Sequence, residues 1–133
     1  MKAIVTGGAG FIGSHLVDLL LGENIAVTVL DNFSTGRPEN LDHVRDQIEL
    51  VKCDLGIPGE WIKQFNNADW VFHLAALADI VPSIQNPEAY FRSNVDGTFN
   101  VLQASKASGT KRFIYIASSS CYGIPDTLSL IHI

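Results

Sequence analysis

The chain has 133 residues, 47% of them hydrophobic and 17% charged, as in a globular domain with a core of its own. Its formal net charge of −5 and the lack of any basic run argue against a nucleic-acid-binding surface. No apolar stretch approaches the ~18 residues that a bilayer requires, we expect no leader peptide, and the two cysteines favour a reducing, cytoplasmic location.

The first predicted unit is a strand, a glycine-rich turn and a helix. The apolar run 3–5 leads into Thr6-Gly7-Gly8-Ala9-Gly10-Phe11-Ile12-Gly13, and the apolar stretch 15–21 follows. We expect Gly22 to cap the helix at its C-terminal end. A second predicted strand, 25–30, ends at Asp31, about 20 residues after the glycines. This context is typical of a unit that binds a dinucleotide.

Each part of this unit has a physical role in holding a dinucleotide. Gly7 or Gly8 permits the sharp turn, since two registers of the glycine pattern fit, and Gly10 lets the backbone approach a pyrophosphate. Gly13 lets the helix pack closely, and the first helical turn directs N–H groups at the phosphates. Asp31 would accept hydrogen bonds from the adenosine ribose hydroxyls and repel a 2′-phosphate, which favours NAD over NADP.

The next elements continue the alternation of strands and helices. A loop leads to Pro38, which suits the first turn of a short helix, and a strand at 48–51 ends at Cys53-Asp54-Leu55. A short helix is predicted around 61–65. The strand at 70–74 is a nearly continuous apolar run, as expected of a strand that is covered on both faces.

A longer helix begins at Asn86-Pro87-Glu88, which offers a capping amide, a proline in the first turn and an acid near the positive pole. It ends before Gly109, and one apolar stripe along it is predicted to pack on the sheet. The stripe consists of Phe91, Val95, Phe99 and Leu102. A fifth strand is predicted at 113–117, directly before Ser118.

This order of elements predicts an α/β, Rossmann-like doubly wound parallel sheet with helices on both faces, truncated after about the fifth strand. Ligands in such sheets bind outside the carboxyl ends of the strands. The glycine turn, Asp31, Asp54, the small-residue segment 74–78 and the serines at 118–120 all follow predicted strands. The agreement of five strand ends is the main internal evidence for a nucleotide site.

Together these motifs resemble those of the extended short-chain dehydrogenase/reductase family, specifically its NAD-dependent sugar-nucleotide epimerase/dehydratase group, of the UDP-glucose 4-epimerase kind. The resemblance covers residues 1–127, which we assign as an incomplete NAD(P)-binding Rossmann domain. Besides the glycine motif, it rests on Asp31-Asn32-Phe33-Ser34-Thr35-Gly36, Asp54-Leu55, His73-Leu74-Ala75-Ala76, Asn94-Val95-Asp96-Gly97-Thr98 and Ser118-Ser119-Ser120-Cys121-Tyr122-Gly123.

The resemblance implies which residues surround NAD. Residues 11 and 12 would lie over the pyrophosphate, 31–36 around the adenosine ribose, 54 and 55 at the adenine, and 74–78 under the nicotinamide half. The implied cofactor-binding residues are Gly7, Gly10, Phe11, Ile12, Gly13, Asp31, Asn32, Ser34, Thr35, Gly36, Asp54, Leu55, Leu74, Ala75, Ala76, Ala78 and Asn94. By the same resemblance, Ser118 is the active-site serine that hydrogen-bonds the sugar 4-oxygen, and Ser119 and Ser120 are candidate substrate contacts.

In this family, the chemistry begins with hydride removal from C4 of a nucleotide-linked hexose, which gives a 4-keto intermediate and NADH. Dehydratases of the family typically carry a Thr-Asp-Glu triplet, whereas this chain has Ser118-Ser119-Ser120. We therefore predict a UDP-hexose 4-epimerase, with a UDP-glucuronate decarboxylase next and a 4,6-dehydratase disfavoured. Two alternatives belong to other classes, a non-catalytic NAD sensor and an NADP-dependent carbonyl reductase. Arg37, which follows Asp31 in the chain, would suit the NADP site of the reductase.

The family's base, a Tyr-x-x-x-Lys pair, is not present in the chain. The residues four positions after Tyr90, Tyr115 and Tyr122 are Asn94, Ser119 and Asp126. We expect this fragment to bind NAD weakly and to be inactive alone. The last six residues, 128–133, no longer follow the family pattern and are expected to be a non-native tail. The full-length protein is expected to be a homodimer, for which the helix face with Tyr90 and Val101 is a candidate.

We predict no metal site, because His15, His43 and His132 show no metal-ligand spacing. His73 is expected to be a buried histidine that ends a core strand, although a place near the nicotinamide is the alternative. Cys121 is expected to be a packed thiol rather than a nucleophile.

Overall fold

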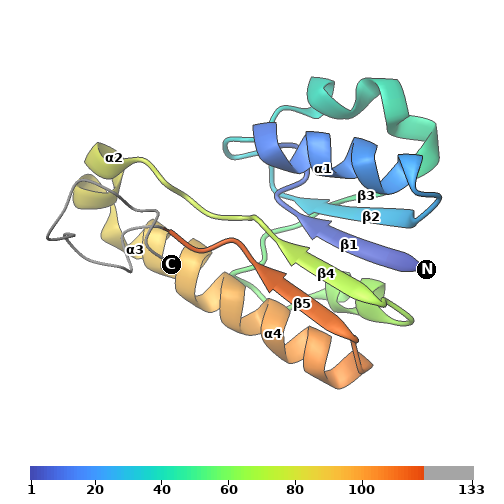
Figure 1. Cartoon of the computed structure of the whole chain (residues 1–133). Helices are drawn as coiled ribbons and strands as arrows, with labels where there is room; N and C mark the ends of the chain where they lie inside the picture. The colour runs from blue at the N-terminus through green and yellow to red at the C-terminus, as the bar shows by residue number, and fades with distance from the viewer. Residues whose placement is uncertain (119–133) are drawn as a thin grey trace, which may run out of the picture.

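The structure is a computed structural model, and it describes residues 1–118 of the chain. Five parallel strands form one sheet in the order β3-β2-β1-β4-β5 (Figure 1). The strands are β1 (Lys2–Thr6), β2 (Ala26–Asp31), β3 (Ile48–Lys52), β4 (Trp70–His73) and β5 (Arg112–Tyr115). The predicted parallel sheet is confirmed. Ser119, Ser120, Cys121 and the predicted tail 128–133 lie outside the described residues.

Helical segments connect the strands. They are α1 (Phe11–Gly22), η1 (Pro38–Gln47), η2 (Glu60–Phe65), α2 (Ile80–Gln85), α3 (Pro87–Phe91), η3 (Arg92–Asp96) and α4 (Gly97–Ser108). Of these, η1 and η2 are 3-10 helices, and Pro38 begins η1 as predicted. None of the helices within residues 1–118 has both the length and the apolar composition needed to span a bilayer.

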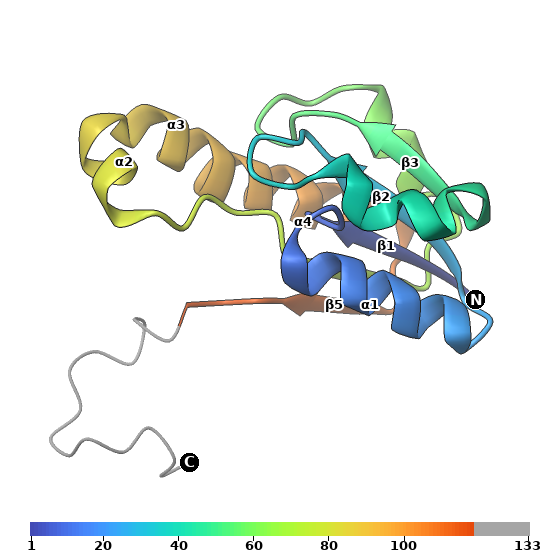
Figure 2. The ribbon, with the colours of Figure 1, turned by 90° about the horizontal axis from the view of Figure 1, so that it is seen from above.

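The helices form a layer on each face of the sheet (Figures 1 and 2). On one face, α1 and η1 pack against Val5 and Val29 through Val17 and Leu41. The opposite face is covered by η2 and α4. There Trp61, Phe65, Val101 and Ala104 pack against Ile4, Leu30 and Val71. Because side chains alternate along a strand, neighbouring residues such as Ile4 and Val5 enter different cores, which explains why the central strands β1 and β4 carry mostly apolar residues.

The end of α1 differs from its prediction. Gly22 is the last helical residue rather than a left-handed cap, and the positive φ of 57° falls at Asn24. The Asn24 N–H donates to the Leu21 carbonyl over 2.9 Å, and the Ile25 N–H donates to the Leu20 carbonyl over 3.0 Å. Asparagine tolerates the left-handed region better than other side chains do, so it takes the role expected of the glycine.

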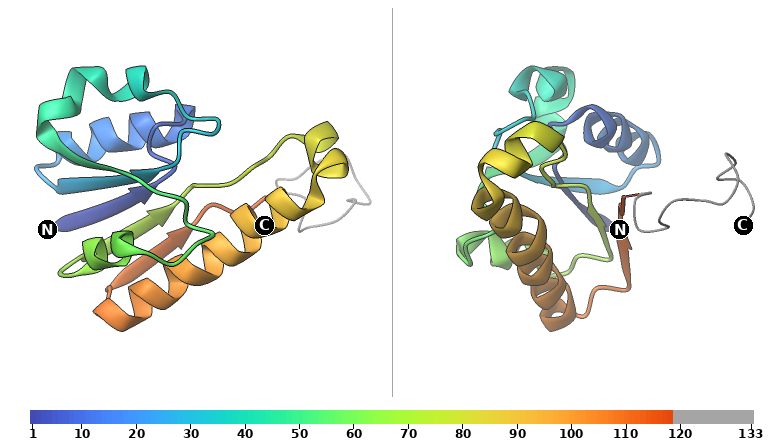
Figure 3. Two further views of the ribbon diagram at one scale, coloured as in Figure 1. Left: turned by 180° about the vertical axis from the view of Figure 1, so that it is seen from behind. Right: turned by 90° about the vertical axis from the view of Figure 1, so that its left-hand side faces the viewer.

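The helix predicted after Asn86 is a continuous run of three segments, α3, η3 and α4. Asn86 caps it by accepting a hydrogen bond from the Ala89 N–H over 3.3 Å, and Gly109 ends it with φ 70°. The middle segment, η3, is a π-helical turn, which the sequence did not predict. Such turns are frequent at functional sites. The α3 end of this run extends past the carboxyl ends of the strands, where α2 lies beside it (Figures 1 and 3).

The prediction that the larger apolar stripe of this helix packs on the sheet is wrong. Phe91, Val95, Phe99 and Leu102 are 59%, 49%, 58% and 45% exposed. The buried positions are the smaller residues Gly97, Val101, Ala104 and Ser105. Both sets repeat with helical spacing, and the smaller set lets α4 lie close to the sheet. The face with Val101, considered for a dimer interface, is therefore inside the core.

Two substitutions distinguish these faces. Val101→Ala is expected to lower the free energy of unfolding by about 2 kcal/mol, because it opens space in a packed core. Phe99→Ala is expected to change that free energy by less than about 0.5 kcal/mol, because the ring is largely exposed in this chain. Urea denaturation followed by circular dichroism measures both. A larger loss for Phe99→Ala than for Val101→Ala would contradict the assigned face.

Candidate functional site

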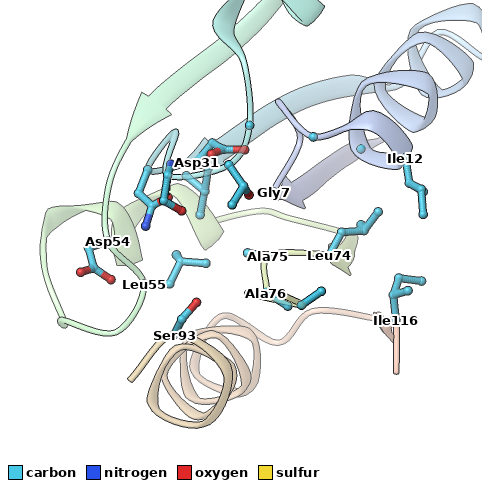
Figure 4. Close-up of a pocket in the computed structure, with 18 of the residues that line it drawn as sticks. Gly7, Ile12, Asp31, Asp54, Leu55, Leu74, Ala75, Ala76, Ser93 and Ile116 are labelled. Atoms are coloured by element: carbon cyan, nitrogen blue, oxygen red, sulfur yellow. The ribbon is translucent and has the colours of Figure 1, made fainter. Parts of the chain in front are cut away.

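A cavity of about 400 Å³ lies at the carboxyl ends of the strands (Figure 4). Asp31, Asp54 and Leu55 lie toward one end of it, and Ile12 and Ile116 toward the other. Its lining residues are Gly7, Gly10, Phe11, Ile12, Gly13, Leu30, Asp31, Asn32, Ser34, Thr35, Gly36, Cys53, Asp54, Leu55, Gly56, Leu74, Ala75, Ala76, Ala78, Ser93 and Ile116. The end of each of the five strands contributes. The cavity adjoins the β1–β4 boundary, where the strand order reverses, as expected for a ligand site in this architecture.

The glycine turn after β1 has no room for side chains. Gly7 has φ 69°, and a Cβ added there would lie 2.8 Å from the Ala75 nitrogen. A Cβ on Gly13 would lie only 2.2 Å from the Gly7 carbonyl oxygen, so the close packing at Gly13 is against the turn itself. Of the two glycine registers that the sequence allowed, the left-handed residue is Gly7. The turn is thereby held against both α1 and the segment after β4.

The N-terminus of α1 faces the cavity. Gly10 is the N-cap and contributes no side-chain cap, and the first turn contains no acidic residue. The backbone N–H groups of Phe11 and Ile12 have no intrahelical acceptor, because no helical carbonyl precedes the first turn of a helix. Both residues line the cavity. Unpaired N–H groups and the positive end of the helix dipole together favour an anionic group such as a phosphate here.

The carboxylate of Asp31 is buried and held by the backbone on both of its oxygens. The Ala9 N–H donates to Oδ2 over 2.9 Å, and the Phe33 N–H donates to Oδ1 over 2.8 Å. Asp31 is 7% exposed and still lines the cavity. A fixed carboxylate beside the helix N-terminus can accept hydrogen bonds from sugar hydroxyls and disfavours a second negative charge at the same place.

The segment after β3 forms one end of the cavity. The Gly56 N–H donates to Asp54 Oδ1 over 2.9 Å, and Arg92 Nη2 lies 3.4 Å from Asp54 Oδ2. Burial, followed by the nearby charges of Asp31 and Asp54, raises the pKa of Cys53 to about 12. The Cys53 thiol therefore stays protonated near neutral pH and acts as part of the wall rather than as a nucleophile.

The segment after β4 is fixed by η3. The side chain of Asn94 donates to the Leu77 carbonyl and accepts from the Leu77 N–H, each over 2.8 Å. Asn94 is not among the lining residues of the cavity, whereas its neighbour Ser93 is. In this structure the Asn94 amide is thus occupied in holding the 74–78 segment in place.

His73 links this segment to β1 and the long helix. Its Nδ1 lies 2.7 Å from Thr6 Oγ1, and its Nε2 lies 2.9 Å from Thr98 Oγ1. The Thr98 hydroxyl donates to the Asn94 carbonyl, so it accepts from His73, which assigns the proton of the neutral ring to Nε2. Thr6 Oγ1 donates to Nδ1 and accepts from the Leu74 and Ala75 N–H groups. His73 is 1% exposed, so the predicted buried histidine is confirmed.

The burial of His73 predicts a pH dependence of stability. Burial lowers the pKa of His73 to about 4, below the ordinary value of 6.5. Between these values the unfolded chain binds more protons than the folded one, so stability is full above pH 6.5 and falls as the pH drops toward 4. The slope is expected to approach ~1.4 kcal/mol per pH unit.

Urea midpoints between pH 5.0 and 7.5 measure this slope. His73→Gln is expected to be less stable at every pH but to lose most of the slope. His43→Gln is the matched control, because His43 is exposed and paired with Asp18 on the surface. An equal slope in wild type and His73→Gln would contradict the assignment.

The structure brings together nearly all of the predicted cofactor-binding residues. All of them except Asn94 line the cavity. Five further lining residues were not predicted from the sequence, and they are Leu30, Cys53, Gly56, Ser93 and Ile116. Leu30, Cys53 and Ile116 lie within a predicted strand or strand-end motif and Gly56 directly follows one, whereas Ser93 reaches the cavity from η3. Ser118 is exposed and is not among the lining residues. No cluster of three or more potential metal ligands occurs within residues 1–118.

Comparison with known proteins identifies the family. The model of the NAD dependent epimerase/dehydratase family matches residues 3–130. The chain belongs to the NAD-dependent epimerase/dehydratase family. NAD is the cofactor of this family. A dinucleotide fits the site described here, because the N-terminus of α1, with Phe11 and Ile12, lines the cavity and Asp31 supplies a fixed acceptor beside it.

Three proteins illustrate how similar this chain is to known proteins in sequence and fold. UDP-glucuronic acid decarboxylase 1 of Arabidopsis thaliana is 42% identical over 127 residues, which cover 94% of this chain and 28% of the relative. The UDP-N-acetylglucosamine 4-epimerase of Methanobrevibacter ruminantium M1, solved with UDP-N-acetylmuramic acid, has a TM-score of 0.88 and 37% identity, covering 98% of this chain and 42% of that chain. The UDP-glucose 4-epimerase of Thermus thermophilus, solved with NAD, has a TM-score of 0.77 and 36% identity, covering 85% and 36%. The chain spans less than half the length of each.

Proposed function

We propose that this chain is the NAD-binding part of a nucleotide-sugar 4-epimerase that acts on a UDP-hexose. The observation that carries the proposal is the cavity at the strand ends, where the glycine turn and the carboxylate of Asp31 meet. The N-terminus of α1 offers N–H groups to a pyrophosphate, and Asp31 offers acceptors to the adenosine ribose. Epimerases of similar sequence and fold support the choice of reaction.

The chain's own residues would bind and orient the cofactor. Asp54 and Leu55 would meet the adenine, and residues 74–78, held by Asn94 and Thr6, would lie beneath the nicotinamide half. When bound, NAD would accept the hydride from C4 of the sugar and return it. Ser118 would donate a hydrogen bond to the sugar 4-oxygen, and Ser119 and Ser120 would contact the substrate.

Decarboxylation of UDP-glucuronic acid is the second candidate, since a decarboxylase of that substrate is 42% identical to this chain. Both candidates share the first oxidation at C4. The decarboxylase would then release CO2 from the sugar, whereas the epimerase would only return the hydride to the opposite face. Dehydration has less support, because elimination of water needs an acid and a base beside the sugar and the serine triplet provides no carboxylate. A non-catalytic NAD sensor would need no serine at the position of Ser118.

The expected base, a Tyr-x-x-x-Lys pair, does not occur among the residues of this sequence. In such a pair the lysine lowers the tyrosine pKa so that the phenol can take a proton near neutral pH. The fragment should therefore bind NAD without turning over a UDP-sugar. Catalysis is proposed only for the whole protein.

Two measurements test the proposal. Calorimetric titration of this chain with NAD and NADP should detect NAD binding and a weaker or absent response to NADP. The full-length protein should interconvert UDP-glucose and UDP-galactose in a coupled assay and release no CO2 from UDP-glucuronic acid. Release of CO2 without interconversion would select the decarboxylase. NAD binding without either reaction would favour the sensor.

We also propose that the full-length protein is a homodimer through the exposed face of the long helix. Phe91, Val95, Phe99 and Leu102 form that face, and they leave a contiguous run of large apolar side chains in water. Sedimentation velocity of the full-length protein should give a dimer, and Phe99→Glu should shift it toward monomer. A monomeric wild type would contradict this part of the proposal.

A further inference from the structure

Two loops of the cavity wall meet at a single residue, Ala9. The glycine turn contains Ala9, and the loop after β2 passes over it, so closely that a Cβ added to Gly36 would lie 3.0 Å from the Ala9 carbonyl carbon and Cβ. Ala9 is fully buried. Its backbone N–H donates to Asp31, and its carbonyl accepts from the Arg37 N–H over 3.0 Å. The N–H and the carbonyl of Ala9 are thus bonded by the last residue of β2 and by the loop that follows it.

Asn40 adds a third hydrogen bond to the same residue. Its Nδ2 donates to the Ala9 carbonyl over 2.8 Å, which is shorter than the bond from Arg37. Asn40 lies in η1 and is half-buried, and it is not among the residues that line the cavity. The side chain can therefore affect a ligand only through the backbone that it holds.

We propose that Asn40 is a positioning residue, which fixes the glycine turn in the shape that receives a pyrophosphate. The proposal rests on the assignment of the cavity to a dinucleotide. Glycine-rich backbone has many accessible conformations, so a turn containing Gly7, Gly8 and Gly10 needs external bonds to stay in one of them. The bonds to Ala9 supply this restraint from Asp31, from the loop that follows it and, through Asn40, from η1. Pyrophosphate and ribose are thereby received by a single rigid unit.

Two variants of Asn40 differ in their expected effect. Asn40→Ala removes the donor but leaves the Ala9 carbonyl bonded to Arg37, so NAD affinity should fall by about threefold to tenfold. Asn40→Asp places a carboxylate oxygen against that carbonyl, and the repulsion should displace the turn and lower NAD affinity by about 10- to 100-fold. Because Asn40→Asp also adds a negative charge, the double variant with Glu39→Gln restores the net charge. Glu39→Gln alone, at the exposed neighbouring position, should leave NAD affinity unchanged.

Ligands of different length separate positioning from general destabilisation. Titrations of this chain with ADP-ribose and with adenosine compare a ligand that has the pyrophosphate with one that lacks it. Asn40→Asp should weaken ADP-ribose binding by the same factor as NAD and change adenosine binding by less than about twofold. Asn100→Asp is the matched comparison, because the Asn100 amide donates to the Leu55 carbonyl over 2.8 Å, in the part of the wall proposed to meet the adenine. That variant should weaken both ligands equally.

Amide hydrogen exchange of the ligand-free chain gives a readout that needs no nucleotide. Asn40→Asp should accelerate exchange at the Ala9 and Gly10 amides and leave the amides of β4 unchanged. If wild type fails to bind NAD, the proposed function fails, and this exchange result alone decides the role of Asn40. Unchanged exchange at Ala9, unchanged ADP-ribose affinity, or an equal loss of adenosine affinity would each overturn the positioning role.

Discussion

Replacement of Gly13 by alanine is expected to weaken NAD binding by about 100-fold or more and to lower the free energy of unfolding by about 1–3 kcal/mol. The added Cβ would lie 2.2 Å from the Gly7 carbonyl oxygen and 2.7 Å from the Gly8 Cα. Both neighbours are backbone atoms, so no side-chain rotation can relieve the overlap. Relief requires that α1 and the glycine turn move apart. That movement displaces the N–H groups of Phe11 and Ile12 from the cavity wall.

Gly22→Ala is the matched control, since Gly22 lies in the same helix and a Cβ added there meets nothing within 4 Å. Alanine is preferred over glycine in a helix, so this variant should be more stable than wild type by about 0.5–1 kcal/mol and should bind NAD unchanged. Calorimetric titration with NAD and urea denaturation measure both variants. Wild-type NAD affinity in Gly13→Ala would refute the role assigned to the turn.

The sheet could be predicted because the sequence marks its strands in two ways, by an apolar run and by the residues that follow the run. A strand that is covered on both faces is apolar over most of its length, as at 70–74, and the polar or small residues that follow it mark its carboxyl end. Five such ends, placed in parallel by helical connections, define one edge of the sheet. All but one of the predicted cofactor-binding residues line the cavity at that edge, so the outline of the site could be predicted from the sequence.

The parts that could not be predicted depend on which helix face turns inward and on how side chains pair. The larger stripe, with Phe99, was the stronger apolar signal, yet the smaller residues around Val101 enter the core. The π-helical turn η3 has no sequence signature, and it changes which residues of the helix reach the cavity. Pairing of the Asn94 amide with Leu77 is a contact between distant segments. Neither spacing nor composition reports such contacts.

Replacement of Asp31 by asparagine is expected to lower NAD affinity by about 30-fold or more, to remove the discrimination against NADP, and to lower the free energy of unfolding by about 2 kcal/mol. Both carboxylate oxygens accept backbone N–H groups, from Ala9 over 2.9 Å and from Phe33 over 2.8 Å. An asparagine has a single acceptor oxygen, so one N–H group would face an NH2 group. That donor would lose its partner, and if it is the Ala9 N–H, the glycine turn would keep only the bond from the Gly7 N–H to the Leu30 carbonyl of β2.

The loss of charge acts on the ligand as well as on the fold. A neutral side chain accepts weaker hydrogen bonds from the ribose and no longer repels a 2′-phosphate, so NAD and NADP affinities should converge. Asp46→Asn, at an exposed position of η1, removes the same charge without touching the cavity and should change neither affinity nor stability. Calorimetric titrations with both dinucleotides, together with urea denaturation, measure these effects. If Asp31→Asn still excluded NADP, the selectivity for NAD would have to come from another part of the cavity wall. The carboxylate of Asp31 would then serve only to hold the backbone of Ala9 and Phe33.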